Sequence, residues 1–312
     1  AREIPDLLRS GEYRWQPFKL VRISPPGGKP RDVYESTRAD GTASGMLMRA
    51  AYDLHVDAAL HDSASAYRRK RGPRQMLEYL FTRATAARPW FLALDVHRYF
   101  PSIDLDAECN DLLALTEDPA FVMYLWLRFS TTAIDDGVAV PLSGVAPGDP
   151  LAALAANHYL CSEDRILAAR LPVYGRYCDD LAALAETRGQ AEDGVALMTS
   201  LLERRGLKVK EGSVRIVDLR VETAELLGLQ FDGEDVYVPE SRVERLRARL
   251  EWVAARYSLR PDLGADRAIG LIRGTLDYAR GASNLNLVYD LARRASQVFP
   301  GGNWKAVLRR SR

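Results

Sequence analysis

Two short acidic stretches determine the fold expected for this chain: Phe91-Leu-Ala-Leu-Asp95 and Tyr177-Cys-Asp-Asp180. The first is an apolar, strand-like run that ends in a carboxylate. The second lies between the apolar runs 171–176 and 181–184, which predicts a hairpin with carboxylates at its tip. Carboxylates at the ends of neighbouring strands can share a pair of divalent cations, and oxygen ligands suit Mg²⁺. Taken alone, however, an Asp-Asp pair in a turn is more often ordinary turn chemistry.

The distribution of charge agrees with a metal-centred reading. The 312 residues carry 43 Lys and Arg against 42 Asp and Glu. By segment the net charge is about +6 over 1–90, about −14 over 91–240 and about +9 over 241–312. An acidic middle between basic flanks fits a nucleic-acid clamp around bound cations, and fits an unevenly charged solvated surface equally well.

Composition excludes several classes of protein. The chain has no apolar run of 18 residues and no basic-then-apolar leader, so neither a membrane span nor a secretory signal is expected. Its three cysteines are an odd number without metal-ligand spacing, which argues against a disulfide scaffold and a zinc site. We therefore expect a cytoplasmic protein with no membrane partner.

Periodicity predicts a mixed body followed by a helical tail. Helical spacing covers 44–61, 73–86, 104–130, 150–169 and 189–206, and strand-like runs follow at 207–209, 213–217, 226–231 and 235–238. From residue 241 onward the pattern is helical. Val243, Leu246, Leu250 and Val253 fall on one face of the first helix of this tail.

The acidic stretches belong to an ordered series of motifs that resembles the reverse transcriptases. The palm motifs of that family correspond, in order, to Phe91–Asp104 (FLALDVHRYFPSID), Gly144–Leu160, Tyr177–Asp180, Gly206-Leu-Lys-Val-Lys210 and Leu226-Leu-Gly-Leu229. Upstream, Gly27-Gly-Lys-Pro-Arg31 and Ala66-Tyr-Arg-Arg-Lys70 resemble finger motifs of its bacterial, group II intron-like branch, which has diversity-generating, CRISPR-associated and defence-associated members.

The resemblance implies an α+β fold of the right-hand polymerase type. It places the fingers at 1–90, the palm, an antiparallel sheet with helices, at 91–240 with a fingers-like insertion at about 105–143, and a helical thumb at 241–312. It also implies a catalytic centre in which Asp95, Asp179 and Asp180 bind two Mg²⁺ ions with help from the Val96 carbonyl. Mn²⁺ is expected to substitute for Mg²⁺.

The substrate contacts are likewise implied by the resemblance. The residues expected to bind the incoming nucleotide are Lys29, Arg31, Phe100, Gly148 and Lys210. Those expected to contact the template and primer are Tyr67, Arg68, Arg69, Tyr177, Leu227, Gly228, Arg242, Arg245 and Arg249. Local pattern alone also allows a core aromatic at Phe100, a plain turn glycine at Gly148 and solvated arginines on the helix that begins near 242.

The implied function is RNA-directed DNA polymerisation, a nucleotidyl transfer that extends a DNA or RNA primer with dNTPs on an RNA template. A structured non-coding RNA or an accessory protein is a further candidate partner.

The second palm motif departs from the family, because Pro147 replaces the usual Gln and Ala152-Ala153 replace Ser-Pro. Pro147 favours a first alternative function, which is template-independent or protein-primed DNA synthesis in phage defence. A second alternative is an RNA-binding, maturase-like scaffold with vestigial polymerase activity. An RNA-dependent RNA polymerase is a further, minor alternative.

Overall fold

The apolar run that ends at Asp95 becomes an inner strand of a four-stranded sheet. This computed structural model describes residues 3–23 and 31–309, which divide into a first unit of 3–23 and 31–216 and a second unit from Val217 onward. The strands of the sheet, in spatial order, are β6 (Val173–Tyr177), β7 (Asp180–Ala185), β3 (Trp90–Asp95) and β8 (Arg215–Asp218). β7 is antiparallel to both β3 and β6, as predicted for the palm sheet.

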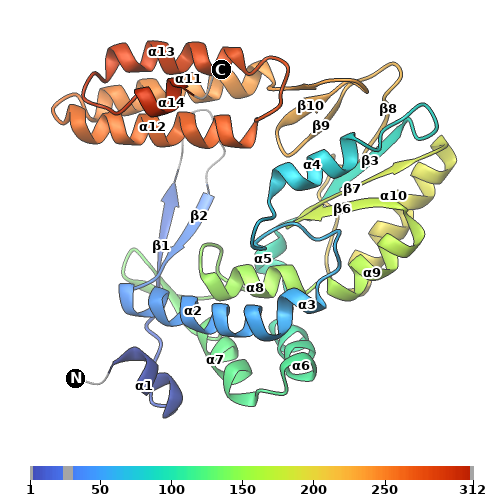
Figure 1. Cartoon of the computed structure of the whole chain (residues 1–312). Helices are drawn as coiled ribbons and strands as arrows, with labels where there is room; N and C mark the ends of the chain where they lie inside the picture. The colour runs from blue at the N-terminus through green and yellow to red at the C-terminus, as the bar shows by residue number, and fades with distance from the viewer. Residues whose placement is uncertain (1–2, 24–30, 310–312) are drawn as a thin grey trace. The chain divides into compact units, whose positions relative to one another are not determined.

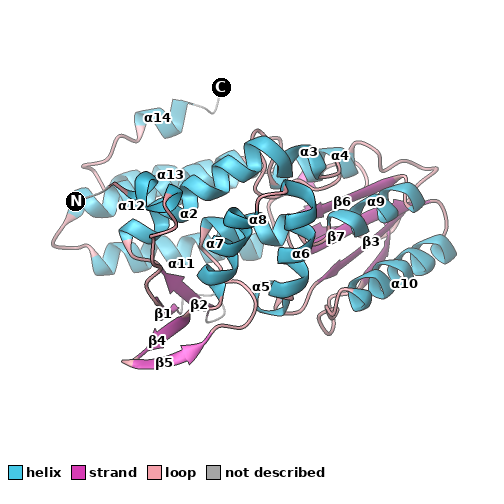
Figure 2. Cartoon of the chain, turned by 90° about the horizontal axis from the view of Figure 1, so that it is seen from below, coloured by secondary structure: helices cyan, strands magenta, loops and turns pink. Residues whose placement is uncertain are grey.

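Helices bury this sheet, which explains why its strands are almost continuously apolar. α10 (Arg188–Arg204) packs on β3 and β7, α9 (Cys161–Arg170) on β6, and α4 (Pro73–Phe81) on β6 as well (Figures 1 and 2). A Cβ at Gly194 would lie 2.8 Å from a methyl carbon of Leu92, so the glycine permits the close approach of α10 to β3. The predicted helix 189–206 and the hairpin around residue 178 are confirmed.

A second sheet in the first unit has the strand order β2-β1-β4-β5. β1 (Phe18–Ile23) is antiparallel to β2 (Arg31–Glu35) and parallel to β4 (Thr132–Asp135), which forms a hairpin with β5 (Val138–Pro141). The sequence analysis assigned no strand to the residues between 130 and 150. The missed signal is Asp136-Gly137, where both residues have positive φ (48° and 86°), as a two-residue hairpin turn requires.

Three of the predicted long helices are interrupted. The segment 104–130 forms α6 (Leu105–Thr116) and α7 (Pro119–Phe129), because Glu117 is left-handed and Asp118 caps α7 with its side chain. The segment 150–169 forms α8 (Pro150–His158) and α9, which are separated at Tyr159-Leu160. The segment 44–61 begins earlier than predicted: α2 spans Arg38–Ala51, a π-helical turn Tyr52–Val56 and α3 Asp57–Ala59.

A buried ion pair joins the second sheet to α8. Arg128 and Asp149 are both fully buried, and Arg128 Nε lies 2.9 Å from Asp149 Oδ2. The guanidinium also donates to the Ser36 hydroxyl and lies 3.7 Å from the ring centre of Phe18 on β1. Asp149 Oδ1 accepts from the Leu151 N–H and so caps α8. One carboxylate therefore starts α8 and neutralises the arginine.

The second unit contains a small sheet and a set of helices. The sheet has the order β11 (Val236–Tyr237), β10 (Leu229–Phe231), β9 (Ala224–Leu226). The helices are α11 (Glu240–Arg256), α12 (Pro261–Tyr278), α13 (Asn286–Val298) and α14 (Lys305–Leu308). Val243, Leu246, Leu250 and Val253 of α11 are buried, as their spacing predicted. The strand expected at 207–209 is reduced to an isolated bridge between Val209 and Val96.

The predicted division between palm and thumb after residue 240 stays a prediction. The compact unit that begins at Val217 takes in β9, β10 and β11 together with the tail helices. Within the described ranges, no helix is both long enough and apolar enough to cross a lipid bilayer.

A second buried acid lies between α6 and α8. Glu108 Oε1 lies 3.0 Å from Nδ1 of His158, whereas Oε2 is buried without a hydrogen-bond partner. Burial is the main cause that raises the pKa of Glu108 to about 7, and the hydrogen bond to His158 partly opposes it. The folded protein therefore holds a proton on this carboxyl at pH values where the unfolded chain has lost it.

We predict that Glu108→Gln changes how stability depends on pH. Because the folded pKa is raised above the unfolded value of 4.5, wild-type stability falls as pH rises from 4.5 to about 7. Glutamine resembles the neutral carboxyl, so the unfolding free energy of wild type should lose up to about 3 kcal/mol relative to the variant across that interval. Urea unfolding at several pH values measures this difference. Glu203→Gln, at an exposed position on α10, is the control, and parallel curves for wild type and Glu108→Gln would contradict the prediction.

Candidate active site

The register between β3 and β7 brings the two acidic stretches together. Asp95, the last residue of β3, lies directly opposite Asp180, the first residue of β7. One residue further, the Val96 N–H donates to the Asp179 carbonyl at 3.0 Å. Side chains directly opposite each other on antiparallel strands lie about 4.5–5.5 Å apart at Cβ. The sequence prediction that these segments meet at one end of the sheet is therefore confirmed at the level of the backbone.

The turn that carries Asp179 has a strained first residue. Tyr177 pairs with Asp180, so the loop consists of Cys178 and Asp179 alone. Cys178 has φ of 58°, in the left-handed region that a residue with a Cβ rarely adopts. Its side chain is buried, and its Sγ lies 3.6 Å from the hydroxyl of Tyr67. Burial raises the pKa of the Cys178 thiol to about 12, so this thiol packs and does not serve as a nucleophile.

A buried arginine holds this turn from below. Arg176 is fully buried, and its NH1 donates to the Cys178 carbonyl at 3.1 Å. Its Nε and NH2 grip both carboxylate oxygens of Asp164 on α9, at 2.9 and 2.6 Å. NH2 also donates to the Asn157 carbonyl at the end of α8. The guanidinium therefore fixes the acidic turn against two helices at once.

The basic segment predicted as a finger motif continues this support. The Ser65 N–H donates to the Arg176 carbonyl, and the Arg176 N–H donates to the Ser63 carbonyl, each at 2.9 Å. Arg68 is itself buried, and its guanidinium bonds Asp57 and the carbonyls of His61 and Ala64. This corrects the expectation that Arg68 contacts the template or primer, because its hydrogen bonds hold the 61–68 loop together.

Burial and mutual repulsion disfavour the fully ionised state of Asp95, Asp179 and Asp180. Burial, followed by the charges of Asp179 and Asp95, raises the pKa of Asp180 to about 7. Burial also raises the pKa of Asp179, with the charge of Asp95 adding to it. Two cations oppose this repulsion at Asp180, Arg215 and Lys210. A bound divalent cation would relieve the same repulsion.

Lys210 contacts the carboxylate of Asp95 directly through its Nζ. The backbones are also joined, because the Lys210 N–H donates to the Asp95 carbonyl at 2.9 Å. Ser213 accepts from the Asp95 N–H through its hydroxyl at 3.2 Å. Lys210, which was predicted to bind the nucleotide, therefore lies beside the metal-ligand candidates.

The carboxylates of the three aspartates are suitable ligands for divalent metals, although their side chains are not yet arranged around a common point. Carboxylate oxygens are the ligands that Mg²⁺ prefers, and among the described residues no arginine forms an ion pair with any of the three aspartates. In the described part of the chain, no group of three His, Cys, Asp or Glu side chains is already arranged to hold a metal. The contact between Asp95 and Lys210 accounts for part of this, because it turns one oxygen of Asp95 toward an ammonium group.

Two of the predicted nucleotide contacts lie on adjoining segments. The Phe100 carbonyl accepts the Val145 N–H at 3.0 Å, so the segment after β3 touches the loop that leads to Gly148. Gly148 has φ of 100°, which favours glycine, and a Cβ added there would lie 3.9 Å from the Tyr34 carbonyl on β2. β2 begins at Arg31, whose side chain lies outside the described part of the structure, as does all of Lys29.

The predicted template and primer contacts of the first unit are only partly exposed. Tyr67 and Arg69 reach the surface, and Arg69 pairs with Asp53 at 2.9 Å. Tyr177 is half-buried at the end of β6. Tyr67 and Tyr177 therefore lie beside the acidic turn, one through its contact with Cys178 and the other through its pairing with Asp180.

In the second unit, the turn Leu227-Gly228 and Arg242 form one local cluster. Both turn residues have positive φ, and Arg242 NH1 donates to their carbonyls at 3.3 and 3.2 Å. The guanidinium lies 4.2 Å from the ring centre of Tyr278, whose hydroxyl donates to the Leu227 carbonyl. Arg242 therefore holds the turn, whereas Arg245 and Arg249 on the same helix are exposed.

The residues that sequence reasoning missed are those that support the site from behind. Arg176 and Ser213 contact the backbone of the acidic segments, and Asp164 holds the Arg176 guanidinium in place. One signal was present, because an arginine in the otherwise apolar strand Val173–Tyr177 requires a buried partner. No sequence pattern identified that partner as Asp164.

An acidic strand end and an acidic hairpin, paired in this register, are the features of a template-directed nucleotidyltransferase. The family model described as "Reverse transcriptase (RNA-dependent DNA polymerase)" matches residues 46–231, which is more than half of the chain. The chain therefore belongs to the reverse transcriptase family and is an RNA-directed DNA polymerase of class EC 2.7.7.49. Members of this family act on nucleic-acid templates and primers with dNTPs and generally use divalent metals. A search of curated proteins gives no match to the chain.

We predict that the Arg176–Asp164 pair positions the acidic turn as well as stabilising the fold. Arg176→Met leaves the buried Asp164 carboxylate without its cation, with the Tyr174 hydroxyl still donating to it, and should lower the unfolding free energy by about 3–5 kcal/mol. Arg176→Met combined with Asp164→Leu should recover most of that stability, because no buried charge remains. Primer extension by the double variant should stay well below wild type, since the Cys178 carbonyl still lacks its donor.

Chemical denaturation and the kcat of primer extension measure the two effects separately. Arg188→Met is the control, because it removes an exposed arginine paired with Glu192 and should cost less than about 1 kcal/mol. A stable double variant that extends primers at the wild-type kcat would show that the pair has a purely structural role.

Proposed function

We propose that Asp95, Asp179 and Asp180 form the catalytic centre of this reverse transcriptase and hold two Mg²⁺ ions with the help of the Val96 carbonyl. The observation that carries the proposal is the register of β3 and β7, which sets Asp95 opposite Asp180 beside the turn that contains Asp179. The raised pKa values of Asp179 and Asp180 support it, because repulsion among buried carboxylates is relieved by bound cations. Mn²⁺ should replace Mg²⁺ with the same ligands.

In the reaction, the protein's own residues orient the acidic turn and compensate the negative charge of its carboxylates. Two metal ions held by these carboxylates would lower the pKa of the primer 3′-OH and neutralise the pyrophosphate that leaves. Arg176 keeps the turn rigid through the Cys178 carbonyl. Lys210 neutralises Asp95 when no cation is bound, and on release from Asp95 its ammonium becomes available to the phosphates of the nucleotide.

The nucleotide is proposed to lie between the fingers and the segment after β3. Lys29 and Arg31 would grip the triphosphate, since an ammonium and a guanidinium at a hairpin suit phosphate oxygens. Gly148 would let the backbone approach the base pair closely, and its φ of 100° supports the requirement for glycine. The ring of Phe100 would occupy the volume that a ribose 2′-OH needs, which selects dNTPs over NTPs.

The template and primer are proposed to follow the exposed basic residues. Tyr67, Arg69 and Tyr177 would contact them beside the acidic turn, and the turn at Leu227-Gly228 would hold the primer end. Arg245 and Arg249 on α11 would track the duplex backbone as part of a helical thumb, their exposure being the supporting observation. The arrangement as a whole would be that of a right-hand polymerase from the group II intron-like branch, with a structured RNA or an accessory protein as a further partner.

We predict that Asp179→Asn combined with Asp180→Asn lowers primer extension by at least about a thousandfold, because two amides cannot replace the charge that binds both metals. The fold should become slightly more stable, since the repulsion between buried carboxylates disappears. Extension of a labelled primer on an RNA template measures activity, and duplex affinity should remain close to wild type. Glu192→Gln with Asp193→Asn, an exposed acidic pair on α10, is the matched control, and extension retained by the 179/180 variant would refute the site.

We predict that Phe100→Ala raises the use of ribonucleotides relative to deoxyribonucleotides by roughly tenfold or more, since the vacated ring volume admits the 2′-OH. Single-nucleotide incorporation kinetics with dNTPs and NTPs measure the ratio. Phe100→Tyr keeps the ring and should keep the wild-type preference. An unchanged ratio in Phe100→Ala would show that Phe100 serves only as a core aromatic packed edge-on against Tyr99.

Template-independent synthesis is the second candidate, and the loop around Pro147 favours it. This loop is held by its backbone, through Val145 to Phe100 and Asp149 to Ala146, and Pro147 offers neither an amide side chain nor an N–H to a template base. Sequencing the products made on a defined RNA distinguishes the two candidates. Product complementary to the RNA supports copying, and non-complementary product supports the alternative and its proposed use in phage defence.

A further inference from the structure

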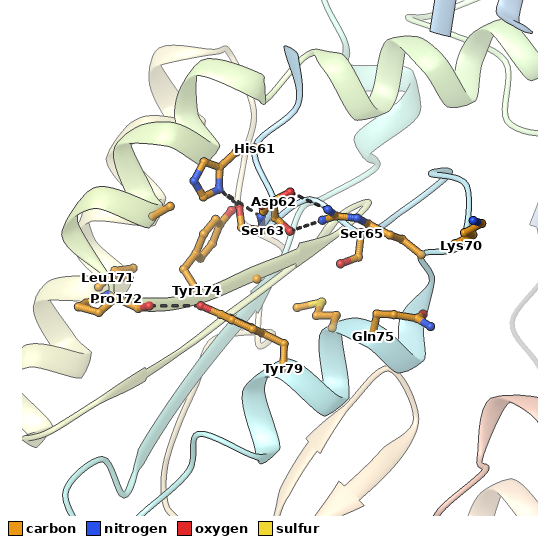
Figure 3. A pocket seen from close by; sticks show the side chains of 14 residues that line it. His61, Asp62, Ser63, Ser65, Lys70, Gln75, Tyr79, Leu171, Pro172 and Tyr174 are labelled. Carbon is orange, nitrogen blue, oxygen red and sulfur yellow. Dashed lines mark hydrogen bonds and ion pairs between the residues drawn. The ribbon is translucent and has the colours of Figure 1, made fainter. Parts of the chain in front are cut away.

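A cavity of about 510 Å³ lies on the outer side of the edge strand β6 (Figure 3). Its walls are the loop His61–Ser65, the start and middle of α4, and the turn Leu171-Pro172. Gly175 contributes to its floor, where a Cβ would lie 3.1 Å from Met76. None of the three aspartates of the proposed catalytic centre lines this cavity. Its volume falls within the range of small-ligand pockets, about 300–1,000 Å³.

The edge of β6 that faces away from β7 borders this cavity, where its residues are largely buried. Arg176 donates its N–H to the Ser63 carbonyl and accepts the Ser65 N–H with its own carbonyl, on the side away from β7. Because strands alternate, Tyr174 directs its own N–H and C=O to the same side, where the cavity lies. This edge of β6 ends at Pro172, which has no N–H, so it is too short to pair with an added peptide strand. The N–H and C=O of Tyr174 can instead pair with one acceptor and one donor of a single nucleobase.

Side chains around this edge complete a base-sized site. Tyr79 borders the cavity with its ring, its hydroxyl bonds the Pro172 carbonyl at 3.3 Å, and Arg83 lies 4.3 Å from the ring centre. Gln75, one turn earlier on α4, brings an amide that can both donate and accept. A ring that can stack on a base next to groups that read its edge is the usual arrangement for unpaired nucleotides.

The charge around the cavity favours a polyanion over a lone nucleotide. Residues 61–90 carry seven Lys and Arg against two carboxylates. Lys70 lies at one end of the cavity, and no carboxylate in the described part of the chain pairs with it. Arg71 beside it is already held by Asp62 at 2.6 Å. The basic surface continues past the cavity to Arg74 and Arg83 on and after α4, as a chain of phosphates would require.

We propose that this cavity binds one unpaired nucleotide of a single-stranded RNA segment that lies outside the template–primer duplex. The base would stack on Tyr79 and bond the edge of Tyr174 and the amide of Gln75, while Lys70 contacts a phosphate. This inference rests on the proposed function in one respect, because RNA is the polymer that the enzyme copies. β6 leads from this cavity to the acidic turn, so bound RNA would be held next to the active site.

The test uses the full chain saturated with a template–primer duplex and a short single-stranded RNA that carries 5-iodouridine. Irradiation should cross-link the RNA to Tyr79, as mapped by mass spectrometry of the peptides. Tyr79→Leu keeps an apolar side chain but removes the stacking ring, and should weaken RNA binding roughly tenfold. Gln75→Ala should weaken it less, and neither variant should alter the thermal melting of the protein by much.

Arg204→Ala is the control, because it removes an exposed positive charge from α10, at a position that neither lines the cavity nor belongs to the basic surface beside it. RNA affinity in Tyr79→Leu equal to that in Arg204→Ala, or cross-links spread over other segments, would overturn the proposal. A DNA strand of the same sequence, or uridine monophosphate, that occupies Tyr79 as well as the RNA would overturn the assignment to an RNA chain. These readouts are independent of primer extension, so failure of the proposed catalytic centre and failure of this site are distinguishable.

Discussion

An arginine that never reaches solvent determines where the acidic turn lies. Arg176 is paired through two nitrogen atoms with Asp164, and its remaining nitrogen holds the Cys178 carbonyl. Burying such a pair is costly, and its attraction repays that cost only when the geometry is good and every donor is used. Here one guanidinium joins β6, α8 and α9 to the turn. The strained φ of Cys178 persists because these contacts overdetermine the backbone around it.

The neighbouring acidic residues require the opposite arrangement. Asp179 and Asp180 are partly buried, and neither receives a guanidinium of its own, so their charges repel each other and Asp95. The Arg176–Asp164 pair behind the turn therefore balances its own charge. The negative charge of the three aspartates is only partly balanced, because Lys210 contacts Asp95 and not the other two. Such an arrangement contributes little to stability, and the cations of the proposed catalytic centre would relieve the repulsion.

The sequence predicted the central elements well because their signals are local. The strand ending at Asp95, the hairpin at Cys178-Asp179 and the buried face of α11 follow from apolar spacing and turn position. The misplaced elements arise where local chemistry interrupts a long pattern, as at Glu117. Arg68 was assigned to the wrong task because sequence shows that a residue is basic but not that Asp57 lies within 2.7 Å of it. Long-range partners of this kind depend on topology, which no short motif contains.

The buried Arg128–Asp149 pair has a mechanical consequence for the first unit. Its carboxylate starts α8 immediately after Gly148, and its guanidinium packs against Phe18 in β1. The Arg128–Asp149 ion pair thus joins β1 to the loop that ends at Gly148. A hinge motion between these two segments would have to break an ion pair that is fully buried. The cost of breaking that ion pair therefore opposes any movement of β1 away from the start of α8.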